Sequence, residues 1–177
     1  MSVRAPSRLL RDAALALLVA VVVPACSLEP RTDTDGSNPS AAEDDPPRRG
    51  IVDAEGVARL PVFSSAVRSG HLLFLSGQIG TEPGAEPLRV VEGGAEAEAR
   101  QTMEHIQTVL AAEDLTMDDV VKCTLFLDDI ADYGVVNEVY ISYFAGEPPA
   151  RSAMSVEALA LGAALEIECV AAYPEGR

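Results

Sequence analysis

Basic residues are scarce in this chain. Its 177 residues include 13 lysines and arginines against 28 aspartates and glutamates, which gives a net charge of −15 at pH 7. Proteins that bind nucleic acid bring clustered lysines and arginines to the phosphate backbone, and a chain of this charge repels that backbone. We therefore predict that nucleic acid is not a partner.

Histidine and cysteine are also few, with two histidines and three cysteines. His71 and His105 stand alone in the sequence, and no group of these residues has the spacing of metal ligands, so we predict no metal and no cofactor. Cys123 and Cys169 lie in apolar strand patterns. They could pair outside the cytoplasm, but two cysteines in separate strands do not specify a bridge, and we favour two small buried apolar side chains.

One long apolar run is present, at residues 13–23. It has about the length of a signal-peptide core and is too short to span a bilayer comfortably. Arg4, Arg8 and Arg11 form a basic segment before it, and the sequence VPAC after it resembles a bacterial lipobox with Cys26 as the lipidated residue. We favour a lipoprotein over a plain cleaved signal or an uncleaved anchor.

The composition divides the chain into three parts. We interpret residues 1–25 as the signal peptide and residues 50–177 as one folded domain. Residues 26–49 between them are rich in proline, serine and aspartate and have almost nothing apolar to bury, so they predict a disordered tether. The expected location is extracytoplasmic, with the domain anchored to a membrane in the periplasm or at the cell surface of a bacterium.

Hydrophobic periodicity predicts the elements of the domain. Apolar residues recur at helical spacing from Ala99 to Leu110, and Asp132 can cap the second helix. The expected elements, in the order β-β-α-β-α-β-β, are strands at 64–67 and 72–76, a helix at 95–113, a strand at 120–127, a helix at 132–144, and strands at 150–157 and 164–173. This order predicts an α+β two-layer sandwich, in which two helices cover one face of a mixed sheet.

The last two strands carry three charged residues of interest. Alternate residues of a strand share a face, so Glu166 and Glu168 lie on one face of the final strand, about 7 Å apart. We expect Arg151 and Ala153 to lie on this same polar face, and Met154 to point toward the helices. The second face of the sheet then needs cover, which another subunit could supply.

Two chemical roles fit these side chains. The planar fork of Arg151 can hold a carboxylate through two parallel hydrogen bonds, and a glutamate beside it can take a proton from water. A neighbouring like charge and partial burial both raise the pKa of a glutamate toward the working range. The alternative is an ordinary cross-strand ion pair on a solvated face, which these residues alone favour.

Five segments occur in an order and spacing typical of one family. They are FSSAVRSGHLLFLSGQIG, EGGAEAEARQTMEHIQTVL, VVKCTLFLDDIADYGVVNEVYISYF, PPARSAMSVEAL and LEIECVAAY. Together they resemble the RidA/YjgF family of enamine and imine deaminases, over nearly all of residues 50–173. The resemblance implies a chorismate-mutase-like fold, a homotrimer with its sheets inside a barrel, and active sites in the clefts between subunits. It also implies hydrolysis of a C=N bond without a cofactor, as in 2-iminobutanoate/2-iminopropanoate deaminases, which turns 2-imino acids or enamines into 2-keto acids and ammonia.

The resemblance also implies roles for particular residues. Arg151 matches the arginine that holds the substrate carboxylate, and Glu166 matches the glutamate that positions and activates water. The remaining matches are a pocket serine (Ser76), a helix asparagine near the site (Asn137), a position that is often cysteine (Ala153) and the place of a common tyrosine (Phe63 or a neighbour). The last two depart from the family pattern and put the preferred substrate in doubt. Ser76 has the simpler interpretation of a strand end, Asn137 of a bond to a nearby loop, and Phe63 of a core side chain.

Three other functions compete with the deaminase. A trimeric module could bind a small carboxylate such as a keto acid without turning it over, in which case Glu166 would not be needed. A ribonuclease or translation inhibitor, an activity also attributed to this family, conflicts with the negative charge of the domain. A chaperone-like protein would keep its activity after loss of Arg151.

Overall fold

The structure is a computed structural model that describes residues 50–57 and 60–174. The predicted signal peptide, the lipidation site Cys26 and the tether lie outside the described residues. The helices and strands are β1 (Gly50–Val52), β2 (Ala66–Ser69), β3 (Leu72–Leu75), α1 (Gly94–Ala111), β4 (Val120–Leu127), α2 (Tyr133–Ile141), β5 (Ala150–Ser155) and β6 (Leu165–Ala172), with short 3₁₀ turns at Met117–Asp119, Ile130–Asp132 and Ala160–Gly162.

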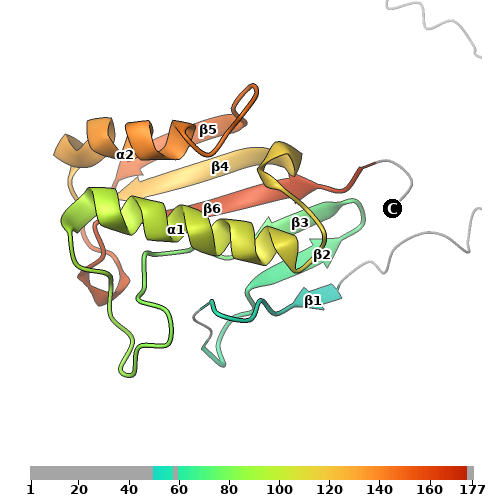
Figure 1. Cartoon of the computed structure of the whole chain (residues 1–177), viewed down its shortest axis with the longest axis horizontal. Coiled ribbons are helices and arrows are strands. Elements are labelled where there is room, and N and C mark those ends of the chain that lie inside the picture. The colour runs from blue at the N-terminus through green and yellow to red at the C-terminus, as the bar shows by residue number, and fades with distance from the viewer. Residues whose placement is uncertain (1–49, 58–59, 175–177) are drawn as a thin grey trace, which may run out of the picture. The chain divides into compact units, whose positions relative to one another are not determined.

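The strands form one six-stranded sheet in the order β1-β2-β3-β6-β4-β5. All neighbouring strands are antiparallel except β4 and β5, which run parallel because α2 carries the chain from the end of one to the start of the other. Both helices lie on the same face of the sheet (Figure 1). The predicted α+β architecture, a mixed sheet with two helices on one face, is confirmed.

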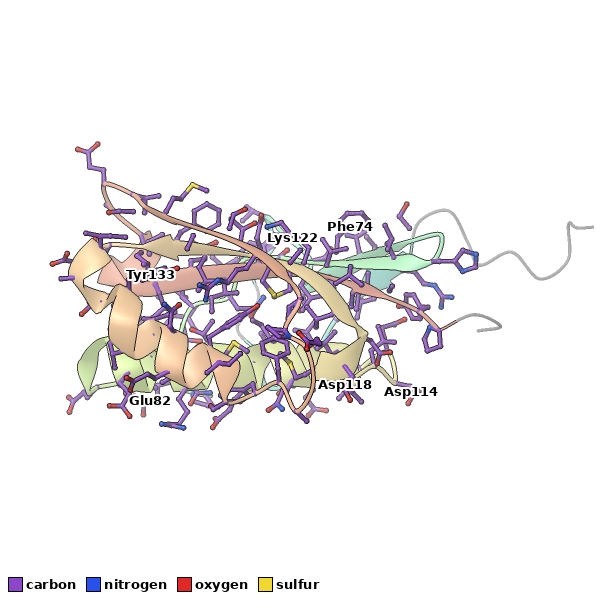
Figure 2. The ribbon with its side chains drawn as sticks, turned by 90° about the horizontal axis from the view of Figure 1, so that it is seen from above. Phe74, Glu82, Asp114, Asp118, Lys122 and Tyr133 are labelled. Carbon is purple, nitrogen blue, oxygen red and sulfur yellow. A yellow bond between two sulfur atoms is a disulfide. The ribbon has the colours of Figure 1, made fainter. Side chains whose placement is uncertain are left out.

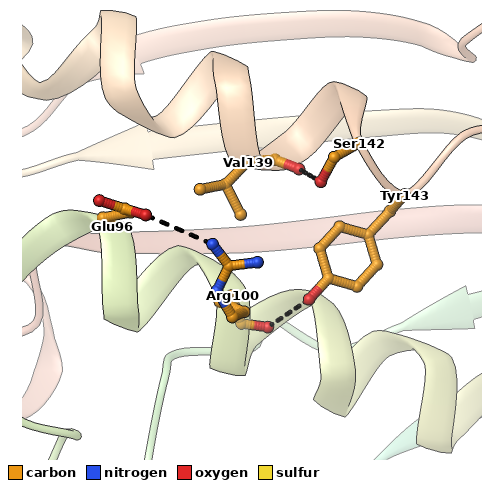
Figure 3. A network of polar contacts seen from close by, with 5 residues as sticks. All are labelled: Glu96, Arg100, Val139, Ser142 and Tyr143. Carbon is orange, nitrogen blue, oxygen red and sulfur yellow. Dashed lines mark hydrogen bonds and ion pairs between the residues drawn. The ribbon is translucent and has the colours of Figure 1, made fainter.

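The helix α1 forms because its apolar residues fall on one stripe. Ala99, Met103, Ile106 and Leu110 are fully buried against the sheet, as the periodicity predicts. On its outer side, Arg100 forms an ion pair with Glu96 at 3.3 Å, and the carbonyl of Arg100 accepts a hydrogen bond at 3.2 Å from the hydroxyl of Tyr143, which follows α2 (Figure 3). This hydrogen bond joins α1 to the segment that follows α2.

The structure differs from the expected elements in β1, in β2, which spans Ala66–Ser69 and not 64–67, and at the start of α2. The strand β1 was missed, because its three residues are too few to show an alternating pattern. The second helix begins later than predicted and is preceded by a 3₁₀ turn. Asp132 makes no side-chain capping bond, whereas the side chain of Asp129 accepts a hydrogen bond from the backbone of Ala131 at 2.8 Å. The side-chain cap therefore belongs to the 3₁₀ turn before α2 and not to α2 itself.

Cys123 and Cys169 form a disulfide between β4 and β6. Both side chains are buried, as expected, but the preferred interpretation of two unpaired cysteines is wrong. The two residues are direct partners across the antiparallel pair, with their Cα atoms 4.1 Å apart. Sequence alone does not give strand register, and it is the register that brings the two sulfur atoms together.

The face assignment of β5 is also wrong. Arg151 pairs with Cys123 and Ala153 pairs with Leu125, and paired residues of neighbouring strands share a face. Cys123 and Leu125 are fully buried under the helices, so Arg151 and Ala153 lie on the helix side. Met154 is 45% exposed on the opposite face, the face on which Figure 2 shows Phe74 and Lys122 turned away from α1.

In the part of the chain that the structure describes, no helix combines the length and the apolar character needed to cross a membrane.

Candidate active site

Glu166 lines a cavity of about 230 Å³ at the start of β6. It is the sole ionisable side chain among the described residues around this cavity. The other lining residues are mostly apolar and come from the segments before β2, after β3 and before β6: Leu60, Phe63, Gly77, Gln78, Ile79, Thr81, Leu88, Ala160 and Leu161. A carboxylate in such a cavity is a candidate for acid–base chemistry.

The surroundings raise the pKa of Glu166 above its ordinary value. Burial is the larger cause, because it disfavours the ionised form, and the charge of Glu168 on the same face of β6 adds to it. The two causes that the sequence predicted, partial burial and a neighbouring like charge, are therefore both present in the structure. A carboxylate with a raised pKa is a stronger base once it is ionised, which suits it to remove a proton from water.

The segment after β3 forms one wall of the cavity and is pinned to β6. The backbone groups of Gln78 and Ile167 exchange two hydrogen bonds, of 2.8 and 2.9 Å. Gly77 lies directly against the Glu166 carboxylate, where a side chain would not fit. The hydroxyl of Ser76 donates to the carbonyl of Ser64 at 2.7 Å, so Ser76 fixes the neighbouring loop and is not one of the residues that line the cavity.

A row of buried polar groups on α1 lies behind this wall. Gly80 packs so closely on α1 that a Cβ there would lie 2.5 Å from the carbonyl oxygen of Glu98. His105 is buried, with its Nδ1 at 3.2 Å from the carbonyl of Ile79, and burial lowers its pKa. The Glu98 side chain accepts a hydrogen bond from the backbone of Ala164 at 2.8 Å, and burial raises its pKa. These contacts hold the cavity walls against the helix.

Arg151 lies in a second group of residues, between β5 and α2. Its guanidinium donates to Asn137 Oδ1 at 2.7 Å and to the hydroxyl of Tyr133 at 3.0 Å, and it lies over the ring of Tyr140 with its carbon 5.0 Å from the ring centre. A cavity of about 420 Å³ adjoins this group, lined by Asn137, Glu138, Tyr140, Ile141, Pro148, Pro149 and Arg151. The guanidinium is thus oriented by three side chains of one helix.

Arg151 and Glu166 are not brought together within the chain. They lie on opposite faces of the sheet, because Arg151 shares the face of Cys123 whereas Glu166 pairs with Phe126 on the other face. The expectation that both occupy one polar face is therefore corrected. Of the predicted site residues, Phe63 lines the cavity with Glu166, Asn137 contacts Arg151, and Ala153 packs against the core beside them.

Sequence reasoning named Asn137 but missed Tyr133 and Tyr140 beside Arg151, and it missed part of the Glu166 cavity. Tyr133, Asn137 and Tyr140 recur at i, i+4 and i+7 and so share one face of α2, which was a usable signal. Burial raises the pKa of Tyr140 to about 12, opposed by the charge of Arg151. Leu161 had no comparable signal, since it reaches the cavity through the geometry of a turn.

The described residues contain no group of three or more histidine, cysteine, aspartate or glutamate side chains placed to hold a metal ion.

Comparisons with known proteins identify the family of the chain. The model of the family described as Endoribonuclease L-PSP matches residues 56–173. The chain belongs to this family, also called RidA/YjgF. A 2-iminobutanoate/2-iminopropanoate deaminase of Rattus norvegicus is 40% identical over 124 residues, which cover 70% of this chain and 89% of that protein. Protein DfrA of Myxococcus xanthus is 40% identical over 126 residues, 70% of this chain and 95% of that protein.

A solved structure has the same fold as this RidA/YjgF domain. The crystal structure of the yeast protein YEO7 is 38% identical and superposes with a TM-score of 0.66, covering 71% of this chain and 99% of that one. The family resemblance predicted from the five sequence segments is thereby confirmed. Several curated relatives at about 40% identity are named as deaminases, so enzymes are present among the relatives of this chain.

Proposed function

We propose that this protein hydrolyses 2-imino acids, or their enamine tautomers, to 2-keto acids and ammonia. The observation that carries the proposal is the isolated carboxylate of Glu166, set with a raised pKa in an apolar cavity. Relatives named 2-iminobutanoate/2-iminopropanoate deaminase support the class of substrate. Arg151, held in a fixed orientation by Asn137 and Tyr133, supplies a group that binds the carboxylate of such a substrate.

The reaction needs one water molecule and one base. The imine nitrogen takes up a proton from solvent, and ionised Glu166 removes a proton from water while the water oxygen bonds to C2. Glu166 then returns its proton to the amino nitrogen of the resulting carbinolamine. The C–N bond breaks, ammonia leaves, and the hydroxyl proton is released as the C=O bond of the 2-keto acid forms. No electron acceptor is required, because the oxidation state of C2 does not change.

The opposite placement of Arg151 and Glu166 gives the proposed site a further requirement. One substrate can contact both residues if Arg151 of one copy meets Glu166 of a neighbouring copy. Arg151 lies on β5, the last strand of the sheet, which pairs on one side with β4 and ends the sheet on the other. A homotrimer with head-to-tail contacts would form three such sites, each between two copies, and would cover the exposed sheet face.

The remaining predicted residues take supporting roles in this proposal. Asn137 orients Arg151, and Ala153 offers its backbone amide near the bound carboxylate. Phe63 forms part of the cavity wall, and Ser76 fixes the loop that carries Gly77.

An imine-competition assay tests the activity. Amino-acid oxidases generate 2-imino acids from several parent amino acids in the presence of semicarbazide, and the protein should reduce semicarbazone formation. Glu166→Gln should remove this effect, since the amide cannot act as a base, at a cost of about 100-fold or more. Glu168→Gln, assayed at a pH where Glu166 is ionised, is the matched control, because it removes a charge from the same face of the same strand and leaves the base in place. Arg151→Lys keeps the charge but loses the fork and should raise KM.

The same assay separates an enzyme from a binding module. If wild-type protein binds 2-keto acids in calorimetry but accelerates the loss of no imine, the deaminase proposal is wrong and the scaffold serves binding. If a chaperone-like activity explained the protein, suppression of aggregation would survive Arg151→Ala. A ribonuclease is disfavoured by the net charge of −15. Strong retention of the protein on RNA at low salt, lost as salt is added, would support a ribonuclease instead.

A mixing experiment tests the two-copy site. Arg151→Ala and Glu166→Gln protomers should each be inactive alone, but a mixed trimer would contain interfaces with one intact arginine and one intact glutamate. Random mixing of equal amounts restores about one site in four when each site takes one residue from each copy. If the mixture stays inactive although trimers have exchanged subunits, both residues act within one protomer and the proposed arrangement fails.

We also propose that the protein works outside the cytoplasm, as a membrane-anchored lipoprotein. The sequence of residues 1–26 supports this, and so does the disulfide of the domain, since disulfides persist mainly in oxidising compartments. Imines made by extracytoplasmic amino-acid oxidases would then be the source of substrate. Cell fractionation with labelled lipid precursor tests the location, and an unlipidated, full-length protein in the cytosol would overturn it.

A further inference from the structure

Three large apolar side chains are exposed around the Glu166 cavity. Leu60, Phe63 and Leu161 are 45%, 39% and 51% exposed, and they come from the segments before β2 and before β6. With Ile79 and Leu88 they make the walls of the cavity apolar. Exposed apolar side chains that converge on one cavity from separate segments mark a surface that binds an apolar group.

Leu161 reaches the cavity through an unfavourable backbone conformation. Its φ and ψ are 58° and 13°, in the left-handed region, and Gly162 follows with a φ of 68°. Among the described residues, Asp114 is the one other residue with a side chain and a positive φ. Aspartate tolerates this conformation, whereas leucine seldom adopts it, and such residues cluster at functional sites. From this conformation the side chain of Leu161 lines the cavity.

The turn that carries Leu161 is fixed from both sides. The backbone amides of Gly162 and Ala163 donate to the carbonyls of Leu159 and Ala160, at 3.2 and 3.1 Å. The backbone of Ala164 is held by the Glu98 side chain through its amide and by the amide of Asp128 through its carbonyl. Leu161 is therefore presented by a rigid turn next to the start of β6, the strand that carries Glu166.

The substituents on C2 of the substrate indicate which group would occupy the apolar cavity. In a 2-imino acid, C2 bears a carboxylate, an imine nitrogen and a side chain. Arg151 takes the carboxylate and Glu166 serves the water and the nitrogen, so the side chain is the substituent left for the apolar walls. A methyl group would leave most of a cavity of about 230 Å³ unfilled.

We propose that this protein prefers 2-imino acids with bulky apolar side chains, of the isobutyl, thioether or benzyl class, and that Leu161 determines this preference. The inference rests on the proposed deaminase function. Leu161 contacts the substrate side chain but takes no part in the proton transfers. Phe63 and Leu60 complete the same wall.

The test compares imines derived from alanine, leucine, methionine and phenylalanine in the competition assay with purified full-length protein. Wild-type kcat/KM should be at least about ten-fold higher for the three bulky substrates than for the alanine-derived imine, as expected for added methylene groups in an apolar pocket. Leu161→Gly removes the side chain at a φ that glycine adopts readily, so the fold should be kept. It should lower kcat/KM for bulky imines about ten-fold more than for the alanine-derived imine.

Asp114→Gly is the matched control, because it makes the same backbone change at the end of α1 and should not alter selectivity. A wild-type preference for the alanine-derived imine, or an equal loss for all four substrates in Leu161→Gly, would overturn the inference. If wild-type protein accelerates none of the imines, the proposed function fails instead. Calorimetry with the matching 2-keto acids then tests the inference. Tighter binding of the bulky acids by wild type, lost in Leu161→Gly, supports the inference. Equal binding of all the acids refutes it.

Discussion

Gly77 and Glu166 are in direct contact across the gap between the end of β3 and the start of β6. A Cβ atom at position 77 would overlap Oε1 of Glu166 and lie 2.7 Å from its Cδ. The backbone of Gly77 does not need the left-handed conformations that favour glycine, since its φ is not positive. Glycine is required here by the space that the carboxylate occupies, so the identity of residue 77 sets the position of the proposed base.

Gly77→Ala should therefore lower activity far more than stability. The added methyl group displaces the end of a flexible side chain, which can move at little cost to the fold. A base shifted by about 1 Å from its productive position loses on the order of 100-fold in rate. The imine-competition assay gives kcat/KM, and thermal unfolding gives Tm.

Gly134→Ala provides the control for this substitution. Gly134 lies in α2, and a Cβ there would meet nothing within 4 Å. Its replacement should leave activity unchanged and raise stability by about 0.5–1 kcal/mol through helix propensity. A Gly77→Ala variant with full activity would show that the position of Glu166 in this cavity does not matter for the reaction.

The charge of Glu168 should be visible in the pH dependence of the reaction. Glu166 must be ionised to act as a base, so activity rises with pH through its pKa, which burial and Glu168 both raise. Glu168→Gln removes the repulsion between the two carboxylates, lowers the pKa of Glu166 and shifts the acid limb of the kcat/KM profile to lower pH. Asp118→Asn removes the same charge from the 3₁₀ turn before β4 and should not move the limb. A limb that stays in place or moves to higher pH in Glu168→Gln would exclude Glu166 as the titrating base.

The parts of the fold that depend on local periodicity could be predicted, and the parts that depend on register could not. The stripe of Ala99, Met103 and Ile106 predicted α1, and the β-branched run at Val120–Leu127 predicted β4. The strand β5 has Arg151, Ala153 and Ser155 on one face and Ser152 and Met154 on the other, so each face mixes polar and apolar side chains and the pattern fits either orientation. The pairing of Arg151 with Cys123 decides the face, and pairing involves residues that are distant in sequence.

The candidate site shows the same division. Arg151 and Glu166 could be identified from the sequence segments that resemble the family, but their separation onto two faces could not. The apolar cavity is assembled from three segments, and Leu161 enters it through a turn whose backbone angles no local pattern indicates. The burial of Glu98 and His105 was not predicted, because polar residues beside an apolar helix stripe are normally expected to be exposed to solvent.

Glu98 should make folding depend on pH in a predictable direction. Burial raises its pKa in the folded protein above the ordinary value of 4.5. Below pH 4.5, Glu98 is protonated in both the folded and the unfolded protein, so its burial costs no free energy of ionisation. As pH rises above it, the unfolded chain loses the proton first, so the folded state loses stability until Glu98 ionises there as well.

Glu98→Gln should remove this penalty, since an amide oxygen can accept the hydrogen bond from Ala164 without a charge. The stability of the variant relative to wild type should rise between pH 4 and neutral pH, as measured by urea unfolding at several pH values. Glu98→Ala leaves the amide of Ala164 without its partner and should cost about 1–3 kcal/mol at a pH below 4.5, where Glu98 is protonated in both states. A variant Glu98→Gln that is less stable than wild type at neutral pH would show that the ionised carboxylate is the form the fold prefers.

The disulfide between Cys123 and Cys169 should contribute measurably to stability. It closes a loop across 46 residues of sequence in the core under the helices, and disulfides of this kind contribute about 2–4 kcal/mol. The double variant Cys123→Ala/Cys169→Ala should lose that amount in urea unfolding, and reductant should destabilise wild type but not the variant. Cys26→Ser is the control, because it removes a cysteine without removing the bridge.

Activity gives a second measure of the bridge. The disulfide lies on the helix face of the sheet and Glu166 on the opposite face, so the double variant should keep its kcat/KM at temperatures where it remains folded. Alkylation of the unreduced, unfolded protein followed by mass measurement counts the free thiols. Labelling of both Cys123 and Cys169 in protein isolated from its own compartment would contradict the bridge, and with it the support that the bridge gives to an extracytoplasmic location.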